Sequence, residues 1–480
     1  MDESRVPTGI DNLDNLIEGG IPRGSLVLLA GNPGTGKTVF GIQFLCKGAE
    51  DCGENGIYVS FAESEETIMY NMSKLFGRDL RNEVNGKVKI LDFTTVTEKG
   101  LGTLLGMILE KVTELKAKRL VIDSFSAMAQ AFKEPIEARS VLHNILGKIV
   151  RNLGCTTILI VEVPIGIEKI GISIEEFVAD GVIILRKGNY EGRLFRELEI
   201  EKLRGTKLER RNFLFTLDKS FRVFPPFSLK EAEASKKFEP TSGTKTHYPT
   251  GIRELDEILG GQGYPRGCSV LFELGENVPI GALDAIINPT ISNFIMRNRG
   301  FITVPTIGYG PEDIRKMISS FTGEEKFDKF VKVLTFPNPL SDMNKPYIVP
   351  WKDPAVEELD AIGNFNRYME AAFELASTTG KNTLHLLSGD NLVFLAEKFN
   401  SSVVGRSVIA NRLGKDLMIY ISQPSIPELT KVFADTLSMH FKIEEKNGSM
   451  VLFGKKPKTI LYVIEPDASR GCRVKLTPII

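Results

Sequence analysis

The sequence predicts an α/β protein of two tandem domains, each with a mainly parallel, twisted sheet flanked by helices. Three observations favour this class. The chain has 480 residues, which is more than one core of ordinary size. Apolar runs typical of buried strands alternate with helical stretches, as in βαβ units. The opening of the chain, residues 6–29, returns at residues 248–272, which indicates a duplicated domain.

The composition excludes several classes of function. Apolar residues make up 42% and charged residues 25%, as in soluble globular proteins. A net charge of −1 gives no reason to expect a nucleic-acid or anionic-membrane partner. No uncharged apolar run reaches the roughly 18–20 residues of a membrane span. The polar start shows no secretory signal and the 5 cysteines form no CxxC pair, so we expect a cytoplasmic protein with inert thiols.

The two copies share the same framing residues. VPTGIDNLDNLIEGGIPRGSLVLL at 6–29 and YPTGIRELDEILGGQGYPRGCSVLF at 248–272 both carry PTGI, LD, a Gly-Gly pair and PRG. Between the copies, residues 226–246 are polar and nearly free of large apolar side chains, as linkers are. We therefore expect one domain at 1–225 and a second at 247–480, joined by this linker.

A complete phosphate-binding loop, GNPGTGKT, lies between a buried strand and a helix in the first copy. Its glycines let backbone N–H groups surround a polyphosphate, and the helix N-terminus adds partial positive charge. Lys37 would contact the β- and γ-phosphates, and the Thr38 hydroxyl would bind Mg²⁺. The expected nucleotide contacts are Gly31, Asn32, Pro33, Gly34, Thr35, Gly36, Lys37, Thr38 and Val39.

Two carboxylates would complete this first site. The apolar strand RLVIDSF ends in Asp123, whose carboxylate would hold the Mg²⁺ and its water. The segment GIYVSFAESEE brings Glu63 to the carboxyl end of another strand, where it would orient the attacking water. Glu65 and Glu66 would begin the next helix, where acids suit the dipole. A helix-start acid is also the alternative for Glu63.

A basic strand follows at LEIEKLRGTKLERR. Lys202 and Arg204 share one side of it, because alternate residues of a strand face the same way. At a subunit edge they would reach a neighbour's nucleotide as an arginine finger does. A solvated basic face is the alternative from the residues alone. Lys207, Arg210 and Arg211 could add a local basic patch.

The second copy lacks this chemistry. LGENVPIGAL stands where the first copy has GNPGTGKT, so no Lys-Thr pair remains. Pro279 also removes a backbone donor where several are needed. The position of Glu63 falls on Tyr309, which cannot act as that base. We expect a second domain that no longer binds nucleotide in the usual way, with an altered pocket as the alternative.

The full set of motifs resembles the KaiC-type ATPases of the RecA/RadA superfamily. The PTGI opening, GNPGTGKT, FAES, VIDSF, IEEFVADGVIIL and KLRGTK all agree in order and spacing. The resemblance covers residues 5–225 strongly and residues 248–480 as a degenerate copy. It implies two RecA-like domains, ATP and Mg²⁺ as ligands, and a homohexamer with nucleotide between subunits. It also implies that Lys202 and Arg204 act in trans.

One departure from this family concerns the rate of hydrolysis. KaiC-type proteins usually show two adjacent glutamates, and this chain has Ala62-Glu63, so turnover should be slow. The pairing of an intact and a degenerate domain also resembles the archaeal gas-vesicle regulators of the GvpD type. We therefore expect a nucleotide-switched ATPase ring that acts through a regulatory protein partner.

Two alternatives belong to other classes of protein. A RadA-related DNA recombination ATPase fits the superfamily, but the near-neutral charge and the missing N-terminal DNA-binding domain count against it. A nucleotide-sensing scaffold without turnover fits the degenerate half, and Glu63 counts against it. No serine or threonine is marked by its context as an acceptor for protein-kinase activity.

Overall fold

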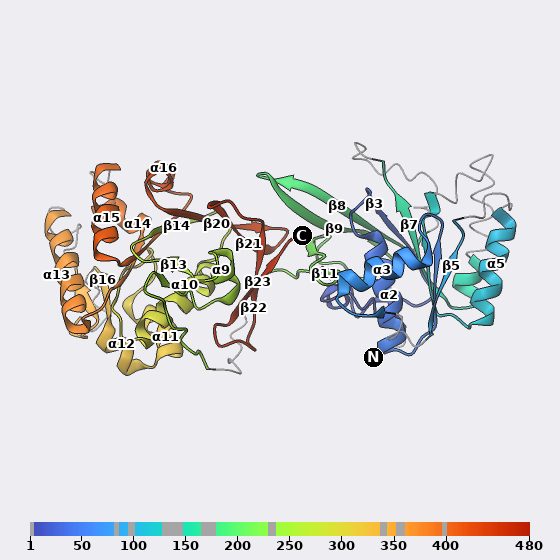
Figure 1. Cartoon of the computed structure of the whole chain (residues 1–480), viewed down its shortest axis with the longest axis horizontal. Helices are drawn as coiled ribbons and strands as arrows, with labels where there is room; N and C mark the ends of the chain where they lie inside the picture. The colour runs from blue at the N-terminus through green and yellow to red at the C-terminus, as the bar shows by residue number, and fades with distance from the viewer. Residues whose placement is uncertain are drawn as a thin grey trace. The chain divides into compact units, whose positions relative to one another are not determined.

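A computed structural model describes residues 4–80, 86–94, 101–126, 147–164, 179–228, 237–336, 343–351, 361–395 and 401–480 (Figure 1). Residues 229–236 of the expected linker lie outside these ranges. Contacts divide the chain into two compact units. Unit 1 comprises Met1–Pro226, Asn447–Ser449 and Pro478–Ile480, and unit 2 comprises Phe227–Lys446 and Met450–Thr477.

Unit 1 is built on a nine-stranded sheet with the order β11-β10-β9-β8-β3-β7-β6-β4-β5. The strands from β8 to β5 in this order are parallel, and β9, β10 and β11 add an antiparallel edge. The strands are β3 Leu26–Gly31, β4 Gly56–Ser60, β5 Val88–Asp92, β6 Arg119–Asp123, β7 Thr156–Glu162, β8 Gly181–Tyr190, β9 Arg193–Leu203, β10 Asn212–Thr216 and β11 Arg222–Val223. The other elements are β1 Arg5–Val6, α1 Leu13–Leu16, β2 Ile21–Pro22, α2 Lys37–Asp51, α3 Glu65–Phe76, α5 Leu101–Glu114 and the π-helical turn Lys148–Asn152.

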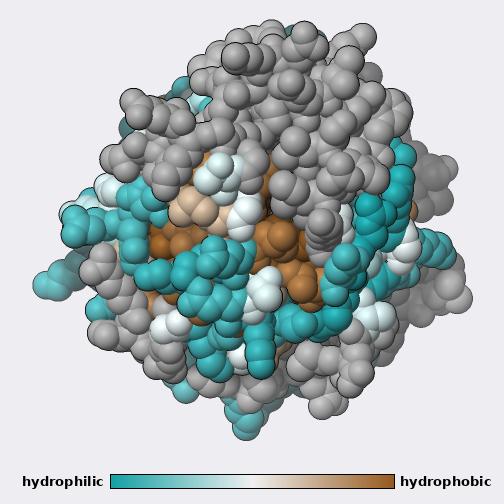
Figure 2. Space-filling model, turned by 90° about the vertical axis from the view of Figure 1, so that its right-hand side faces the viewer, coloured by the Kyte–Doolittle hydropathy of each residue, from teal (hydrophilic) through white to brown (hydrophobic). Residues whose placement is uncertain are grey.

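Apolar side chains on both faces of β3 explain why helices cover this sheet on both sides. Val27 and Leu29 pack in a core shared with α2 and α3. Leu28 and Ala30 point the other way, into a core shared with α5. Figure 2 shows the end of unit 1 that carries α5 and β5, where apolar surface lies between hydrophilic side chains. The two cores therefore bury β3 on both faces in the middle of the sheet.

Unit 2 repeats this topology on a ten-stranded sheet. Its order β16-β15-β18-β19-β14-β20 matches β5-β4-β6-β7-β3-β8 of unit 1 strand for strand. The ten strands of this sheet are β14 Ser269–Leu274, β15 Phe301–Val304, β16 Val331–Thr335, β17 Ile348–Pro350, β18 Leu384–Ser388, β19 Leu417–Ser422, β20 Met439–Lys446, β21 Ser449–Lys456, β22 Tyr462–Pro466 and β23 Val474–Pro478. A separate two-stranded sheet pairs β12 His247–Tyr248 with β13 Tyr264–Pro265. Its helices are α9 Arg253–Ile258, α10 Ile280–Met296, α11 Pro311–Thr322, α12 Glu324–Phe330, α13 Ala361–Thr379, α14 Gly389–Leu395, α15 Ser401–Gly414 and α16 Pro427–Thr436.

The mainly parallel sheets with helices on both faces confirm the predicted α/β class. The repeat seen in the sequence therefore corresponds to a repeat of sheet topology. Within the described ranges, no helix has both the length and the apolar character that crossing a bilayer requires.

Candidate functional site

The predicted phosphate-binding loop joins the carboxyl end of β3 to the first turn of α2. Gly34 and Gly36 have φ angles of 75° and 103°, in the left-handed region that strains other residues. A Cβ on Gly31 would lie 2.6 Å from the Leu185 carbonyl oxygen and 2.7 Å from Thr35 Oγ1. Glycine at these positions permits the tight turn that precedes the helix N-terminus, where anions bind.

The side chain of Lys37 folds back over the loop that precedes it. It is 7% exposed, and Nζ donates to the carbonyl oxygens of Gly31 at 2.9 Å and Asn32 at 3.0 Å. Burial lowers the pKa of Lys37, while the charges of Glu162 and Asp123 oppose that shift. The loop thus holds an ammonium group next to the backbone that would surround a phosphate.

Thr38 and Asp123 meet beside the loop. Thr38 Oγ1 donates a hydrogen bond to Asp123 Oδ2 at 2.8 Å, and the Tyr58 hydroxyl donates a short one to the same oxygen. Burial raises the pKa of Tyr58 well above its ordinary value, and the charge of Asp123 adds to the shift. A hydroxyl and a carboxylate are the hard oxygen ligands that Mg²⁺ prefers.

The number of carboxylates also fits Mg²⁺. Within the described residues, no group of three or more His, Cys, Asp or Glu side chains could hold a metal by itself. Mg²⁺ in nucleotide sites takes one or two protein ligands and completes its shell with water and phosphate oxygens. Thr38 and Asp123 would hold the ion in that manner.

Glu63 lies just beyond the carboxyl end of β4, and β4 pairs with β6 so that Ser60 is opposite Asp123. The Glu63 N–H donates to Ser60 Oγ at 3.1 Å, and Ser60 Oγ donates to the Glu63 carbonyl oxygen at 2.6 Å. This turn places Glu63 at the same sheet edge as Asp123. Its side chain is exposed, and among the described residues its carboxylate makes no hydrogen bond or ion pair. Glu65 begins α3, as predicted.

Lys202 and Arg204 lie away from the phosphate-binding loop of their own chain. Lys202 is opposite Val182, near the amino end of β8, whereas the loop leaves the carboxyl end of the parallel strand β3. Lys202 Nζ donates to the Ala179 carbonyl oxygen at 2.6 Å, and Arg204 Nη1 lies 3.4 Å from Asp180 Oδ1. Neither cation completes the site in cis, so their action in trans stays a prediction.

Three charged residues near the loop escaped the sequence analysis. Glu162 ends β7 and attracts Lys37. Arg196 Nη1 donates to the Gly34 carbonyl oxygen at 3.3 Å, and Lys187 Nζ would lie 3.0 Å from a Cβ on Gly34. Glu162 could have been predicted from the sequence as a residue near the loop, because it is an acid at the end of a buried strand. Lys187 and Arg196 belong to no motif, and the β8–β9 hairpin alone brings them to the loop.

The second copy keeps the strand order of the first but lacks its loop lysine, threonine and strand-end aspartate. α10 begins after Pro279, and its first turn contains neither lysine nor threonine. Ser388 takes the place of Asp123, since both end the strand that follows the same neighbour in the sheet order. Counting back from the residues that cap α3 and α11, Tyr309 corresponds to Glu63. Its hydroxyl donates to Asp284 Oδ2 at 3.3 Å.

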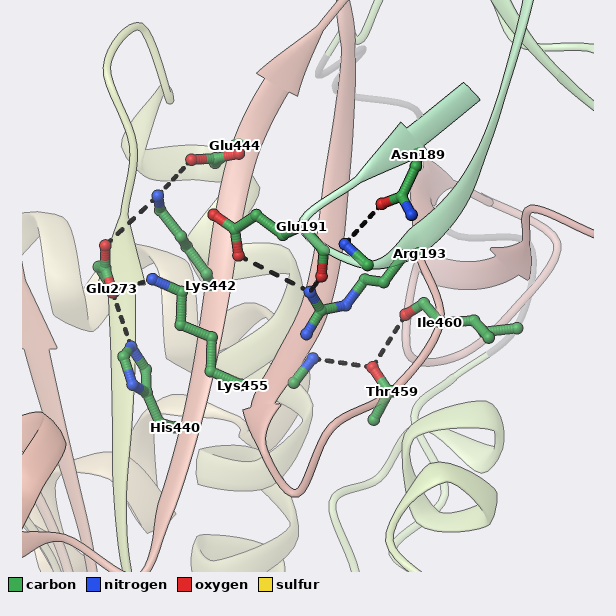
Figure 3. Close-up of polar contacts among 12 residues, drawn as sticks. Asn189, Glu191, Arg193, Glu273, His440, Lys442, Glu444, Lys455, Thr459 and Ile460 are labelled. Carbon is green, nitrogen blue, oxygen red and sulfur yellow. Dashed lines mark hydrogen bonds and ion pairs between the residues drawn. The ribbon is translucent and has the colours of Figure 1, made fainter. Parts of the chain in front are cut away.

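A cluster of charged side chains occupies the end of β14 in unit 2 (Figure 3). Glu273 accepts a hydrogen bond from His440 Nε2 at 2.7 Å and lies 3.4 Å from Lys442 Nζ and 3.3 Å from Lys455 Nζ. Burial alone would raise the pKa of Glu273, but His440 and the two lysines lower it to about 2. In unit 1 the equivalent of Glu273 is the core residue Ala30.

Comparison with known protein families assigns the two halves of the chain to different families. Residues 6–225 match the ATPase family KaiC. Residues 237–480, just over half of the chain, match the family GvpD basic region 2. The chain has a KaiC-like ATPase domain and belongs to the GvpD basic region 2 family through its second half.

Individual relatives match this KaiC-like chain over different lengths. The circadian clock oscillator protein KaiC of Thermostichus vulcanus is 33% identical over 269 residues, which cover 54% of this chain and 49% of that protein. This chain therefore spans about half the length of the clock proteins that it matches. Protein GvpD2 of Halobacterium salinarum is 27% identical over 471 residues, 93% of this chain and 91% of that protein.

Smaller relatives match just under half of the chain over almost their whole length. A UPF0273 protein of Aeropyrum pernix is 36% identical over 237 residues, which cover 46% of this chain and 94% of that protein. The crystal structure of a KaiC-like protein from Pyrococcus horikoshii has 39% identity, a TM-score of 0.41 and coverage of 46% of this chain and 99% of that one.

Proposed function

We propose that this KaiC-like chain binds Mg-ATP in unit 1 and hydrolyses it slowly. The nucleotide state then switches a homohexameric ring in the cytoplasm that controls a protein partner. The observation that carries the proposal is the hydrogen bond from Thr38 to Asp123 beside an intact phosphate-binding loop. That pair has the chemistry of a Mg²⁺ site in phosphoryl-transfer proteins.

Each residue has a separate task in this proposal. Lys37 neutralises the β- and γ-phosphates, while Thr38 and Asp123 hold the Mg²⁺ that bridges them. Glu63 orients and polarises the attacking water. Lys202 and Arg204 reach the nucleotide of the neighbouring subunit, because they lie at the opposite sheet edge from their own loop. The charge that develops on the phosphoryl group is then stabilised from both subunits.

The second half of the chain has another role in the proposal. The domain at 247–480 replaces the loop lysine and the strand-end aspartate, so it transfers no phosphoryl group. It serves instead as the module that a partner protein recognises in the ring. The linker at 226–246 joins it to the ATPase domain at 1–225.

Steady-state release of phosphate from Mg-ATP tests this function. The full chain, Lys37→Ala and Glu63→Gln are compared, with light scattering for molar mass in the same samples. We expect hexamers that depend on ATP, slow turnover by the unchanged chain and none by either variant. A monomer under all conditions would refute the ring.

A nucleotide-sensing scaffold without turnover is the second candidate. The second copy favours it, since its loop helix begins without a lysine or threonine and its equivalent strand ends in Ser388. ATP binding and ring assembly without any phosphate release, in the unchanged chain and in Glu63→Gln alike, would support the scaffold against the ATPase.

A further inference from the structure

A pocket in unit 2 is lined by several positively charged side chains. It lies where the parallel strands β15 and β18 begin, at the opposite end of the sheet from the altered phosphate loop. It has a volume of about 250 Å³ and lies beside the end of α10 and the turns that precede β15 and β18. Its lining includes Arg297, Arg299 and Lys381 and contains no Asp or Glu. The altered loop at 274–280 follows the carboxyl end of β14, so this pocket is a different site.

Arg299 is the inner cation of this pocket. Its guanidinium lies 5.2 Å from the ring centre of Tyr248 and 5.9 Å from that of Phe294. Among the residues that the structure describes, no oxygen accepts a hydrogen bond from it. Desolvation lowers the pKa of Arg299 and nearby Arg266 lowers it further, while Tyr248 and Asp416 offset part of this shift. A partly desolvated cation without an acceptor is costly, and a bound anion would remove that cost.

Two further cations lie at the rim of the pocket. Arg297 Nη2 donates to the Pro240 carbonyl oxygen at 2.7 Å and to Ser242 Oγ at 2.8 Å. Lys381 Nζ donates to the Arg297 carbonyl oxygen at 2.9 Å. These contacts hold both side chains in place and use only part of their donors, since a guanidinium carries five N–H groups and an ammonium three. The remaining donors are available to an anion.

Asn293 provides an independent sign of a ligand. It is 3% exposed, and its Nδ2 donates to the Pro249 carbonyl oxygen at 3.1 Å. Its Oδ1 is buried and has no hydrogen-bond partner among the described residues. Buried amide oxygens in folded proteins are almost always paired, so a ligand that donates a hydrogen bond here would satisfy this one. A simple anion brings no such donor.

We propose that this pocket binds a small hydroxylated phosphate ester. The phosphate oxygens accept hydrogen bonds from Arg299, Arg297 and Lys381, which suits the strong pairing of guanidinium with phosphate. A hydroxyl group of the same ligand donates to Asn293 Oδ1. A pocket of about 250 Å³ lies just below the usual volume of small-molecule sites, which suits a small ligand.

Calorimetric titration of the full chain tests the proposal. Every protein carries Lys37→Ala, so that the loop in unit 1 takes up no probe. The probes are glycerol 3-phosphate, inorganic phosphate and glycerol. We expect one glycerol 3-phosphate per chain, weaker binding of inorganic phosphate and no binding of glycerol. Binding of glycerol alone would overturn the proposal, and so would the absence of binding by both phosphates at about 10 mM, a concentration at which even a weak site is occupied.

Two added substitutions assign the roles of the residues. Arg299→Gln should weaken binding of glycerol 3-phosphate at least about tenfold, or ~1.4 kcal/mol. Arg253→Gln is the matched control, because Arg253 is an exposed arginine of unit 2 paired with Glu257. Asn293→Leu should abolish the preference for glycerol 3-phosphate over inorganic phosphate. Fluorescence of Trp351, the sole tryptophan and a buried residue of unit 2, verifies that each variant is folded.

Equal binding by Arg299→Gln and Arg253→Gln would show that the pocket is not the site. Equal affinity of the parent protein for the two phosphates would overturn the assignment of a hydroxyl to Asn293. Both outcomes are independent of ATP hydrolysis, since no protein in the titration retains Lys37.

Discussion

Thr38 Oγ1 lies 2.8 Å from Asp123 Oδ2, and this contact joins residues 85 positions apart in the chain. β7 lies between β3 and β6 in the sheet, so neither strand alone brings the two residues together. The helix α2 packs against β6 and carries Thr38 to the end of that strand. The proposed metal site therefore depends on the order of the strands as much as on the two motifs.

Thr38→Ala should weaken the binding of the Mg²⁺ that accompanies ATP. The substitution removes the hydroxyl ligand and retains the helix, because alanine favours helical structure. We expect the Mg²⁺ concentration for half-maximal ATP binding to rise at least about tenfold, or ~1.4 kcal/mol. Fluorescent ATP analogues titrated at several Mg²⁺ concentrations measure it. Thr113→Ala on the exposed face of α5 is the control, and an equal effect of both changes would contradict the assignment.

Gly31→Ala should destabilise unit 1 as well as its nucleotide site. The new Cβ would lie 2.6 Å from the Leu185 carbonyl oxygen, a backbone atom that cannot move without shifting β8. Overpacking of this kind costs about 1–3 kcal/mol. Urea unfolding followed by circular dichroism measures the loss. Gly106→Ala is the matched change, because a Cβ there meets nothing within 4 Å, and it should not destabilise the protein.

Local spacing explains which parts of the site were predictable. Lys37 and Thr38 belong to a sequence motif that directly follows an apolar strand, and Asp123 is the last residue of another apolar strand. Tyr58 looked like an ordinary core residue, yet its hydroxyl reaches Asp123. Arg196 reaches the loop because β9 folds back antiparallel to β8, and the register of that pairing is a tertiary property. Contacts between distant strands leave no periodic signal in either strand.

Asp284 should make unit 2 less stable as the pH rises. Burial raises the pKa of Asp284 to about 7, although the hydrogen bond from Tyr309 opposes the shift. A carboxyl whose folded pKa lies above its unfolded value stabilises the fold fully below the unfolded pKa, 3.8, and loses that contribution as the pH rises through about 7. Asp284→Asn should remove this loss of stability, which is on the order of 4 kcal/mol over the full range of pH.

Urea unfolding monitored by Trp351 fluorescence measures this effect, because the probe lies within unit 2. The unfolding free energies of the parent chain and Asp284→Asn are compared at about pH 5 and about pH 8, on either side of the folded pKa. The parent should lose stability relative to the variant between the two values. A constant difference would show that Asp284 does not titrate in this range.

Glu273 should have the opposite dependence on pH. His440 and two lysines overcome the effect of burial and lower the pKa of Glu273 to about 2, so its contribution is present above 4.5 and is lost as the pH falls through about 2. Glu273→Gln should therefore destabilise unit 2 near neutral pH, on the order of 3 kcal/mol, because it leaves partly buried cations without a counter-charge. Trp351 fluorescence reports the loss. Glu428→Gln, at an exposed pair with Lys431, should have almost no effect.

Mixed rings can decide whether Arg204 acts on the neighbouring subunit. Arg204→Gln should retain ATP binding and lose turnover, because the arginine lies at the opposite sheet edge from its own loop. Lys37→Ala should bind no ATP yet still offer Arg204 to its neighbour. Neither variant alone should release phosphate. A mixture should, because an Arg204→Gln subunit beside a Lys37→Ala subunit combines an intact loop with an intact arginine. An inactive mixture of assembled rings would place the arginine outside the reaction, as a solvated charge paired with Asp180.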